Sequence, residues 1–212
     1  MQKITSITVA ALAMLTGAPA ATAADTPKLH PVAELCVTYQ LSGPMMEGTN
    51  LQCHRRHGYE SYRQETTKIK IPGMSQTQSN LSVTIGPDIY AINRKAGTAT
   101  KTKNPMYEGI AKSADRAPAD YAKAIGMNPT GRTEEHLGLP CNVYSNPQIG
   151  DMCMTEDGIT LRTKMPNMTM TATEVRRDAG DTAIYDLPKQ LKIQEGPDLS
   201  QGIQGLMKQY RK

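Results

Sequence analysis

Short β-type segments separated by tight-turn residues recur along this chain, and they restrict it to an antiparallel sheet. The clearest segment alternates apolar Leu81, Val83 and Ile85 with polar residues, which is the period of a strand with one buried face. Gly86-Pro87-Asp88 then supplies a turn, and Ala96-Gly97 supplies the next. Strands are predicted at 34–42, through Cys53 to Arg56, at 59–71, 81–85, 89–93 and 98–103, around Cys141 and Cys153, and at 159–165, 168–175 and 184–187. Strands joined by tight turns in this way indicate a meander.

Two segments have helical features instead. The stretch 117–125 has Pro118 in its first turn and Gly126 at its end, which predicts an internal helix. The stretch 197–212 places apolar residues at helical spacing beside Lys208, Arg211 and Lys212. We predict an amphipathic helix or tail there, which packs on its own sheet, caps a binding cavity or makes a peripheral contact with a membrane surface.

The first residues resemble an export signal. Lys3 precedes an apolar run at 7–15, and Ala21-Thr22-Ala23 supplies the small-residue pattern of a cleavage site. The run is well short of the roughly 20 residues that a spanning helix needs. We therefore expect a signal peptide at 1–23, a single domain at 24–196, and a mature protein that is periplasmic or secreted.

Four cysteines in an exported chain predict two disulfides before any metal or catalytic role. Three connectivities can be drawn. Turn signals midway between Cys36 and Cys53, and again midway between Cys141 and Cys153, favour the local pairing. Each bridge would then join the two strands of one hairpin.

Composition excludes one class of partner and makes the core unusual. The formal net charge is only +4, which is too small to argue for nucleic-acid binding. Phe and Trp are absent and Met occurs 13 times, so Ile, Leu, Val, Tyr and flexible Met side chains must fill the interior.

Four short elements in the second half carry a resemblance to a known family: Gly131 and Gly138 before Cys141, then 158–161 (Gly-Ile-Thr-Leu), 171–175 (Thr-Ala-Thr-Glu-Val), and Leu187-Pro188. These four sequence elements resemble those of the periplasmic half-barrel proteins related to the lipoprotein carrier LolA, most closely their uncharacterised DUF4412 branch. The resemblance implies an α+β fold in which a strongly curved antiparallel sheet, a half β-barrel, is covered by a few helices around an apolar cavity. It also implies a hydrophobic or lipid ligand, with a lipoprotein among the candidates.

Strand parity selects eight apolar residues as candidates for the inner face of such a sheet. These are Leu81, Val83, Ile85, Ile159, Leu161, Met165, Met168 and Met170. They form either an ordinary core or the wall of a cavity for an acyl chain, which Met side chains would suit because they adapt to varied shapes. We expect a monomer that binds its ligand without chemistry and without a cofactor.

Two other functions stay open. Met152-Cys153-Met154 and the methionines at 165–170 could supply soft sulfur ligands to copper in the periplasm, although the same positions suit a core strand. A structural or interaction protein with no small ligand is the other alternative.

No residue is predicted to be catalytic or to bind a metal. No hydrolase, metalloprotease, phosphate-binding or dinucleotide-binding motif is present. Adjacent positions in Glu134-Glu135-His136 diverge on a strand, so this triplet is expected to be a polar approach to the Gly138 turn. The segment with His54 and His57 is expected to be a solvated strand end rather than a pair of ligands.

Overall fold

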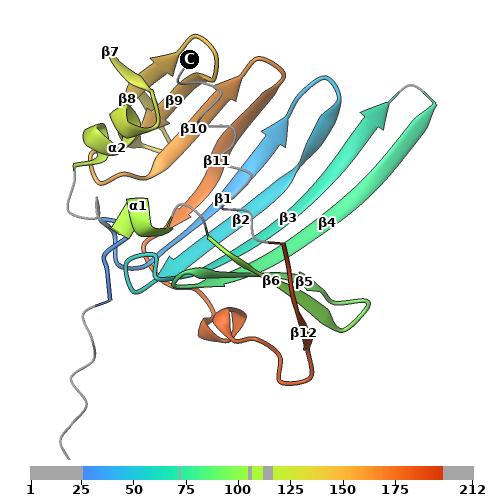
Figure 1. Cartoon of the computed structure of the whole chain (residues 1–212). Coiled ribbons are helices and arrows are strands. Elements are labelled where there is room, and N and C mark those ends of the chain that lie inside the picture. Colours follow the sequence, from blue (N-terminus) through green and yellow to red (C-terminus); the bar gives the residue numbers. More distant parts are fainter. Residues whose placement is uncertain (1–25, 72, 105–106, 112–116, 198–212) are drawn as a thin grey trace, which may run out of the picture.

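Twelve strands form one sheet in the computed structural model of this chain, which describes residues 26–71, 73–104, 107–111 and 117–197 (Figure 1). The strands are β1 (Leu35–Ser42), β2 (Met46–Arg55), β3 (Glu60–Ile71), β4 (Met74–Ile85), β5 (Asp88–Asn93), β6 (Thr98–Lys103), β7 (Asn128–His136), β8 (Leu139–Asn146), β9 (Gly150–Met154), β10 (Thr160–Met165), β11 (Met168–Arg176) and β12 (Lys192–Glu195). The short helical segments are α1 (Tyr107–Ala111), α2 (Pro118–Ala124) and the 3-10 helix η1 (Thr182–Tyr185).

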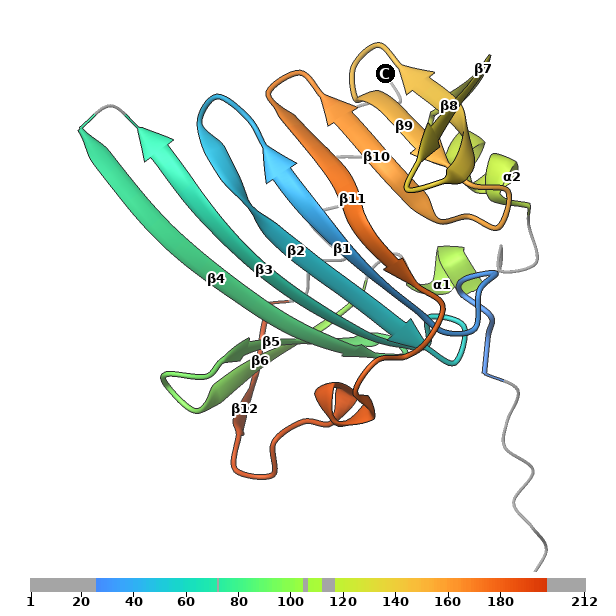
Figure 2. The same cartoon turned by 180° about the vertical axis from the view of Figure 1, so that it is seen from behind.

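Two consecutive meanders make up the sheet and meet at β1 and β11. Strands β1 to β6 pair in chain order, β7 to β11 do the same, and every neighbouring pair within them is antiparallel. Strand β1 pairs antiparallel with β11, which places Leu41 opposite Met170. Strand β12 then returns to the far edge and pairs with β6 in parallel. Figure 2 shows the resulting curved sheet from behind.

The two faces of the sheet bury different side chains. Leu35, Val37 and Tyr39 alternate along β1, and all three are buried on the side that we call the inner face. The residue between the first two, Cys36, points to the opposite side, the outer face. Directly paired residues continue the outer face across the sheet: Cys36, Cys53, Tyr62 and Val83.

The segment after β11 covers the outer face. Ala179 and Tyr185 are buried against the outer-face residues, and Ile184 and Leu187 pack on the same cluster. Asp181 begins η1 by accepting a hydrogen bond from the Ala183 N–H at 3.0 Å. The predicted strand at 184–187 is therefore wrong, because a capping aspartate starts a helical turn there.

The predicted α+β class, a curved sheet covered by a few helices, is wrong in its helical part. Within the described residues α1 has five residues and α2 has seven, and irregular chain and η1 supply the cover instead. The helix predicted at 117–125 does correspond to α2, and its Ala122 is fully buried beside Met127 and Tyr144. Seven residues make only about two turns, so α2 contributes one contact patch rather than a layer. The curvature of the sheet is compatible with the prediction, but the described chain is almost entirely β.

Both disulfides that the turn signals favoured are present. Cys36 and Cys53 lie opposite each other on β1 and β2, and Cys141 and Cys153 join β8 to β9. No free cysteine is found in the described part of the chain. Two bridges indicate an oxidising compartment outside the cytoplasm.

Two predictions concern the ends of the chain. The signal peptide at 1–23 and the body of the C-terminal helix or tail at 197–212 lie outside the described residues. Among the helices that the structure does describe, none is long and apolar enough to cross a membrane.

Candidate functional site

A cavity of about 500 Å³ lies on the inner face. One side of its wall is apolar and is formed mainly by β1, β9, β11 and the turn before β10. The apolar lining consists of Leu29, Pro31, Leu35, Val37, Tyr39, Met152, Met154, Ile159 and Met170. These residues come from both meanders, so the cavity lies across the junction of β1 and β11.

The other side of the cavity wall is polar. It is built from inner-face positions on β2, β3 and β4, and directly paired residues form its rows. Val37 is opposite Gln52, which is opposite Arg63 on β3. The next row joins Leu35, His54, Ser61 and Thr84. A ligand in this cavity would therefore contact hydrocarbon on one side and hydrogen-bonding groups on the other.

Tyr39 connects the two meanders at the cavity wall. Its ring is buried on β1, and its hydroxyl donates a hydrogen bond to the Thr160 carbonyl oxygen on β10 at 2.9 Å. Burial raises the pKa of Tyr39 far above its ordinary value, so the side chain remains a neutral phenol at physiological pH. A neutral phenol keeps this donor available, and the contact holds the apolar side of the cavity in place.

Three histidines fasten the lead-in segment 29–33 over one end of the cavity. The His54 ring nitrogen Nε2 lies 3.0 Å from the Val32 carbonyl oxygen, and His57 Nδ1 lies 3.0 Å from the His30 carbonyl oxygen. His30 Nδ1 accepts from the Val32 N–H at 3.1 Å, and the His30 and His54 rings lie 4.4 Å apart. The segment with His54 was expected to be a solvated strand end, and this is wrong for His54 because the lead-in covers it.

Burial lowers the pKa of His30 from 6.5 to about 4, and electrostatic repulsion from His54 is the second, smaller cause. As the pH falls, His30 takes up a proton near pH 6.5 in the unfolded chain but only near pH 4 in the folded chain. We therefore expect the free energy of unfolding to fall by roughly 3 kcal/mol as the pH drops through this window. Urea unfolding at pH 7.5 and pH 4.5 measures the change. The variant H30N keeps an acceptor for the Val32 N–H but does not titrate, so it should reduce the pH dependence of the free energy of unfolding. Burial also lowers the pKa of His54, so part of the pH dependence should remain. An unchanged profile in H30N would contradict this assignment.

The eight residues predicted to lie on the inner face are found in the cavity lining, in the outer-face cluster and at positions outside the cavity lining. Ile159 and Met170 line the cavity. Leu81, Val83 and Ile85 belong to the outer-face cluster with Tyr185.

The remaining three residues of that set lie outside the cavity lining. Leu161 is fully buried in the core near Cys153 and Val37. Met165 and Met168 face each other across the β10–β11 turn and are only partly buried. An extended lead-in at 24–31 was predicted, but its place over the cavity and the polar wall were not. The alternation of Leu35, Val37 and Tyr39 was the available sequence signal for β1.

Three of the methionines considered as copper ligands, Met152, Met154 and Met170, line the same cavity, whereas Met165 and Met168 lie outside it. Met152 and Met154 are buried beside Ala122 of α2, and the Thr160 hydroxyl donates to the Met152 sulfur at 3.8 Å. Among the described residues, no group of three or more His, Cys, Asp or Glu side chains is arranged to hold a metal ion. Such groups do not include Met sulfur, so the copper alternative stays a prediction.

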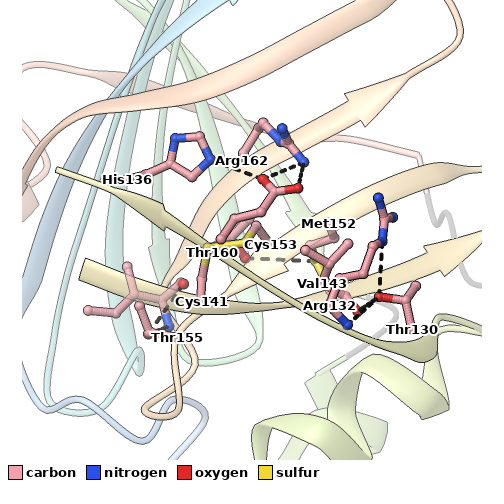
Figure 3. The surroundings of a disulfide bond; sticks show 12 residues. Thr130, Arg132, His136, Cys141, Val143, Met152, Cys153, Thr155, Thr160 and Arg162 are labelled. Atoms are coloured by element: carbon pink, nitrogen blue, oxygen red, sulfur yellow. Dashed lines mark hydrogen bonds and ion pairs between the residues drawn. A yellow bond between two sulfur atoms is a disulfide. The ribbon is translucent and has the colours of Figure 1, made fainter. Parts of the chain in front are cut away.

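An ion-pair cluster lies beside the Cys141–Cys153 bridge (Figure 3). The Glu134 carboxylate accepts from the Arg162 guanidinium at 2.8 Å, and His136 Nε2 lies 3.3 Å from the same carboxylate. Desolvation opposes ionisation of Glu134, but the hydrogen bonds from His136 and Arg162 are stronger in sum and lower its pKa. The cluster stabilises the β7 end of the sheet, and none of its members lines the cavity.

Comparison with known proteins assigns no family. No family model and no curated protein matches the chain. One similar solved structure is that of an uncharacterized conserved protein from Thermus thermophilus, at 9% identity and a TM-score of 0.49, covering 78% of this chain and 91% of that one. Similarity at this level does not indicate a function.

Proposed function

We propose that the mature protein is exported and binds a hydrophobic or lipidic molecule in the inner-face cavity, without catalysing a reaction. The carrying observation is a cavity of about 500 Å³ with one mostly apolar side, in which Thr163 of β10 lies between Met152 and Met170. Pockets for small molecules and cofactors commonly span about 300 to 1,000 Å³ and are mostly apolar. An acyl chain fits both the size and the lining.

The polar side of the cavity supports an amphipathic ligand rather than a pure hydrocarbon. Gln52, Ser61 and Thr84 offer neutral hydrogen-bonding groups, and Arg63 is the one fully charged residue of the lining within the described chain. The Arg63 guanidinium is paired with Glu65 at 2.7 Å, so its charge is partly offset. A ligand with an uncharged or singly anionic polar end would satisfy these groups while its chain lies against Val37 and Met170.

The methionines in the apolar wall would let the cavity accept ligands of different shapes. Met152, Met154 and Met170 have unbranched, flexible side chains that can adjust to chains of different length. We therefore expect a mixture of related lipids rather than one ligand. A relation to the LolA-like carriers and a periplasmic location are consistent with this function and stay predictions.

Replacing Met170 by glutamate should remove ligand binding, because a carboxylate would have to be buried against Val37 and Tyr39. Native mass spectrometry of the mature protein purified from its own compartment should show acyl-chain adducts on the unmodified protein and none on M170E. The matched control is T173E, which places the same charge at an exposed position of the same strand. Circular dichroism confirms that each variant folds.

Two results would contradict the proposal. Protein that carries no adduct, and that also fails to take up a fluorescent fatty-acid analogue, would leave the cavity without a lipid. Equal loss of adduct in M170E and T173E would show that the effect does not arise in the cavity. The first result would favour a structural or interaction protein, and the second would place lipid binding outside the cavity.

A further inference from the structure

One rim of the sheet carries a row of chain reversals with apolar residues at their tips. The β1–β2 turn contains Pro44 and Met45, the β10–β11 turn contains Pro166, and the β8–β9 turn contains Pro147 and Ile149. The antiparallel register places all three at the same end of the strands, and Figures 1 and 2 show these hairpin ends side by side. We call this edge the turn rim.

Close backbone contacts hold the neighbouring turns together. A side chain on Gly43 would collide with the Asn167 carbonyl oxygen, and one on Gly150 would collide with the Lys164 carbonyl oxygen. Both glycines therefore allow the β1–β2 and β8–β9 turns to approach the β10–β11 strands closely. The Met45 carbonyl also accepts from the Lys70 N–H at 2.8 Å. The turn rim is thus a fixed edge.

The end of α2 extends the same edge. The Asn146 side-chain amide donates to the Gly126 carbonyl oxygen at 2.7 Å, which places Ile125 next to the β8–β9 turn. Side chains at the turn rim are unusually exposed for their size: Met45 is 58%, Ile149 43% and Ile125 39% exposed. These are three of the five large exposed apolar residues in the described chain. Met46, Met165 and Met168 lie between them and are partly exposed.

Positive charge surrounds these tips. Lys68 and Lys70 lie at the end of β3, Lys164 precedes the β10–β11 turn, and Lys123 lies in the last turn of α2. The nearby acidic residues are Glu47, which pairs with both Lys68 and Lys70, and Asp151, which pairs with Arg132. Cations outnumber anions along the turn rim.

We infer that the turn rim docks on an anionic lipid surface. Single apolar side chains project from protruding turns and are separated by lysines, so the rim matches a layer in which hydrocarbon lies beneath negative headgroups. A protein partner would be expected to meet a continuous, packed apolar patch, and the rim offers separated tips instead. This surface is independent of the inner-face cavity, since Met45, Ile125 and Ile149 do not line it.

Vesicle flotation of the full mature protein tests this docking. The protein should bind vesicles that contain phosphatidylglycerol and bind pure phosphatidylcholine vesicles much more weakly. The double variant M45N/I149N should lower the partition coefficient on the anionic vesicles by at least about tenfold, because two apolar tips no longer enter the layer. Asparagine leaves the net charge unchanged, so the loss would report the apolar contact.

Two controls separate docking from other effects. L137N/I193N removes two apolar residues that are 52% and 50% exposed but lie at the β7–β8 turn and on β12, away from the rim, and it should bind like the unmodified protein. M170E should also still bind, because its added charge lies in the cavity lining and not at the turn rim. Absence of vesicle binding, equal loss in both asparagine pairs, or loss in M170E would each overturn the inference. The last result would place lipid contact in the cavity alone.

Discussion

Replacing Tyr185 by alanine is expected to lower the free energy of unfolding by about 3 to 5 kcal/mol, the range for truncating a large buried aromatic side chain. Only 1% of Tyr185 is exposed, and its ring packs on the Cys36–Cys53 bridge, Tyr62 and Val83. Removing the ring would leave a void under the outer face and would release η1 from the sheet. Urea unfolding followed by circular dichroism measures the loss.

The variant Y185F separates ring packing from the hydroxyl group. Burial raises the pKa of Tyr185 to about 12, so the phenol stays protonated and donates to the Ala179 carbonyl oxygen at 3.0 Å. Loss of this single hydrogen bond should cost about 1 kcal/mol. A similar cost for Y185A and Y185F would show that the 179–187 segment contributes little packing energy to the outer face.

Replacing Cys36 and Cys53 together by alanine is expected to cost about 3 kcal/mol. The two residues are 17 apart in sequence, and a closed loop of this size removes a matching amount of conformational freedom from the unfolded chain. Both side chains are 2% exposed, so some packing is lost as well. Chemical unfolding of the unmodified and double-alanine proteins without reductant gives the difference.

The second bridge provides the comparison. Cys141 and Cys153 are 12 apart, so the chain-entropy argument predicts a cost close to that of the first bridge. A double-alanine variant at this site should therefore unfold at a similar urea concentration. A difference of several kcal/mol between the two variants would contradict an entropic origin and would point to their different packing.

The strand pattern was predictable from sequence, but the face that each strand presents was not. Alternation of Leu81, Val83 and Ile85 identified the last five residues of β4 (Met74–Ile85), but not its first seven. The alternation does not indicate which face of the sheet lines the cavity, because it establishes only that alternate residues of one strand share a face. The face is decided by register with β3, where Val83 is opposite Tyr62, and no local signal encodes that pairing.

Two other parts of the fold depend on contacts between distant segments. Strand β7 is mostly polar and exposed, so it has no apolar alternation and was not predicted in full. His54 is shielded by 29–33, a segment more than twenty residues earlier, and a lone histidine near a strand end gives no sign of this cover. The disulfide pairing was predictable because turn residues lie within each short cysteine loop.

The order of strands also determines what the protein exposes while its chain is still emerging and folding. In the finished sheet β1 lies in the centre, but its second neighbour, β11, lies more than 120 residues later in the chain. A chain that emerges from its N-terminal end can complete β1 to β6, and can close Cys36–Cys53, while β1 is still an unpaired edge rich in apolar residues. Such an edge is a template for pairing with other chains. The interval before 168–176 arrives is therefore when this protein is most exposed to aggregation, and when a chaperone would have a free strand to protect.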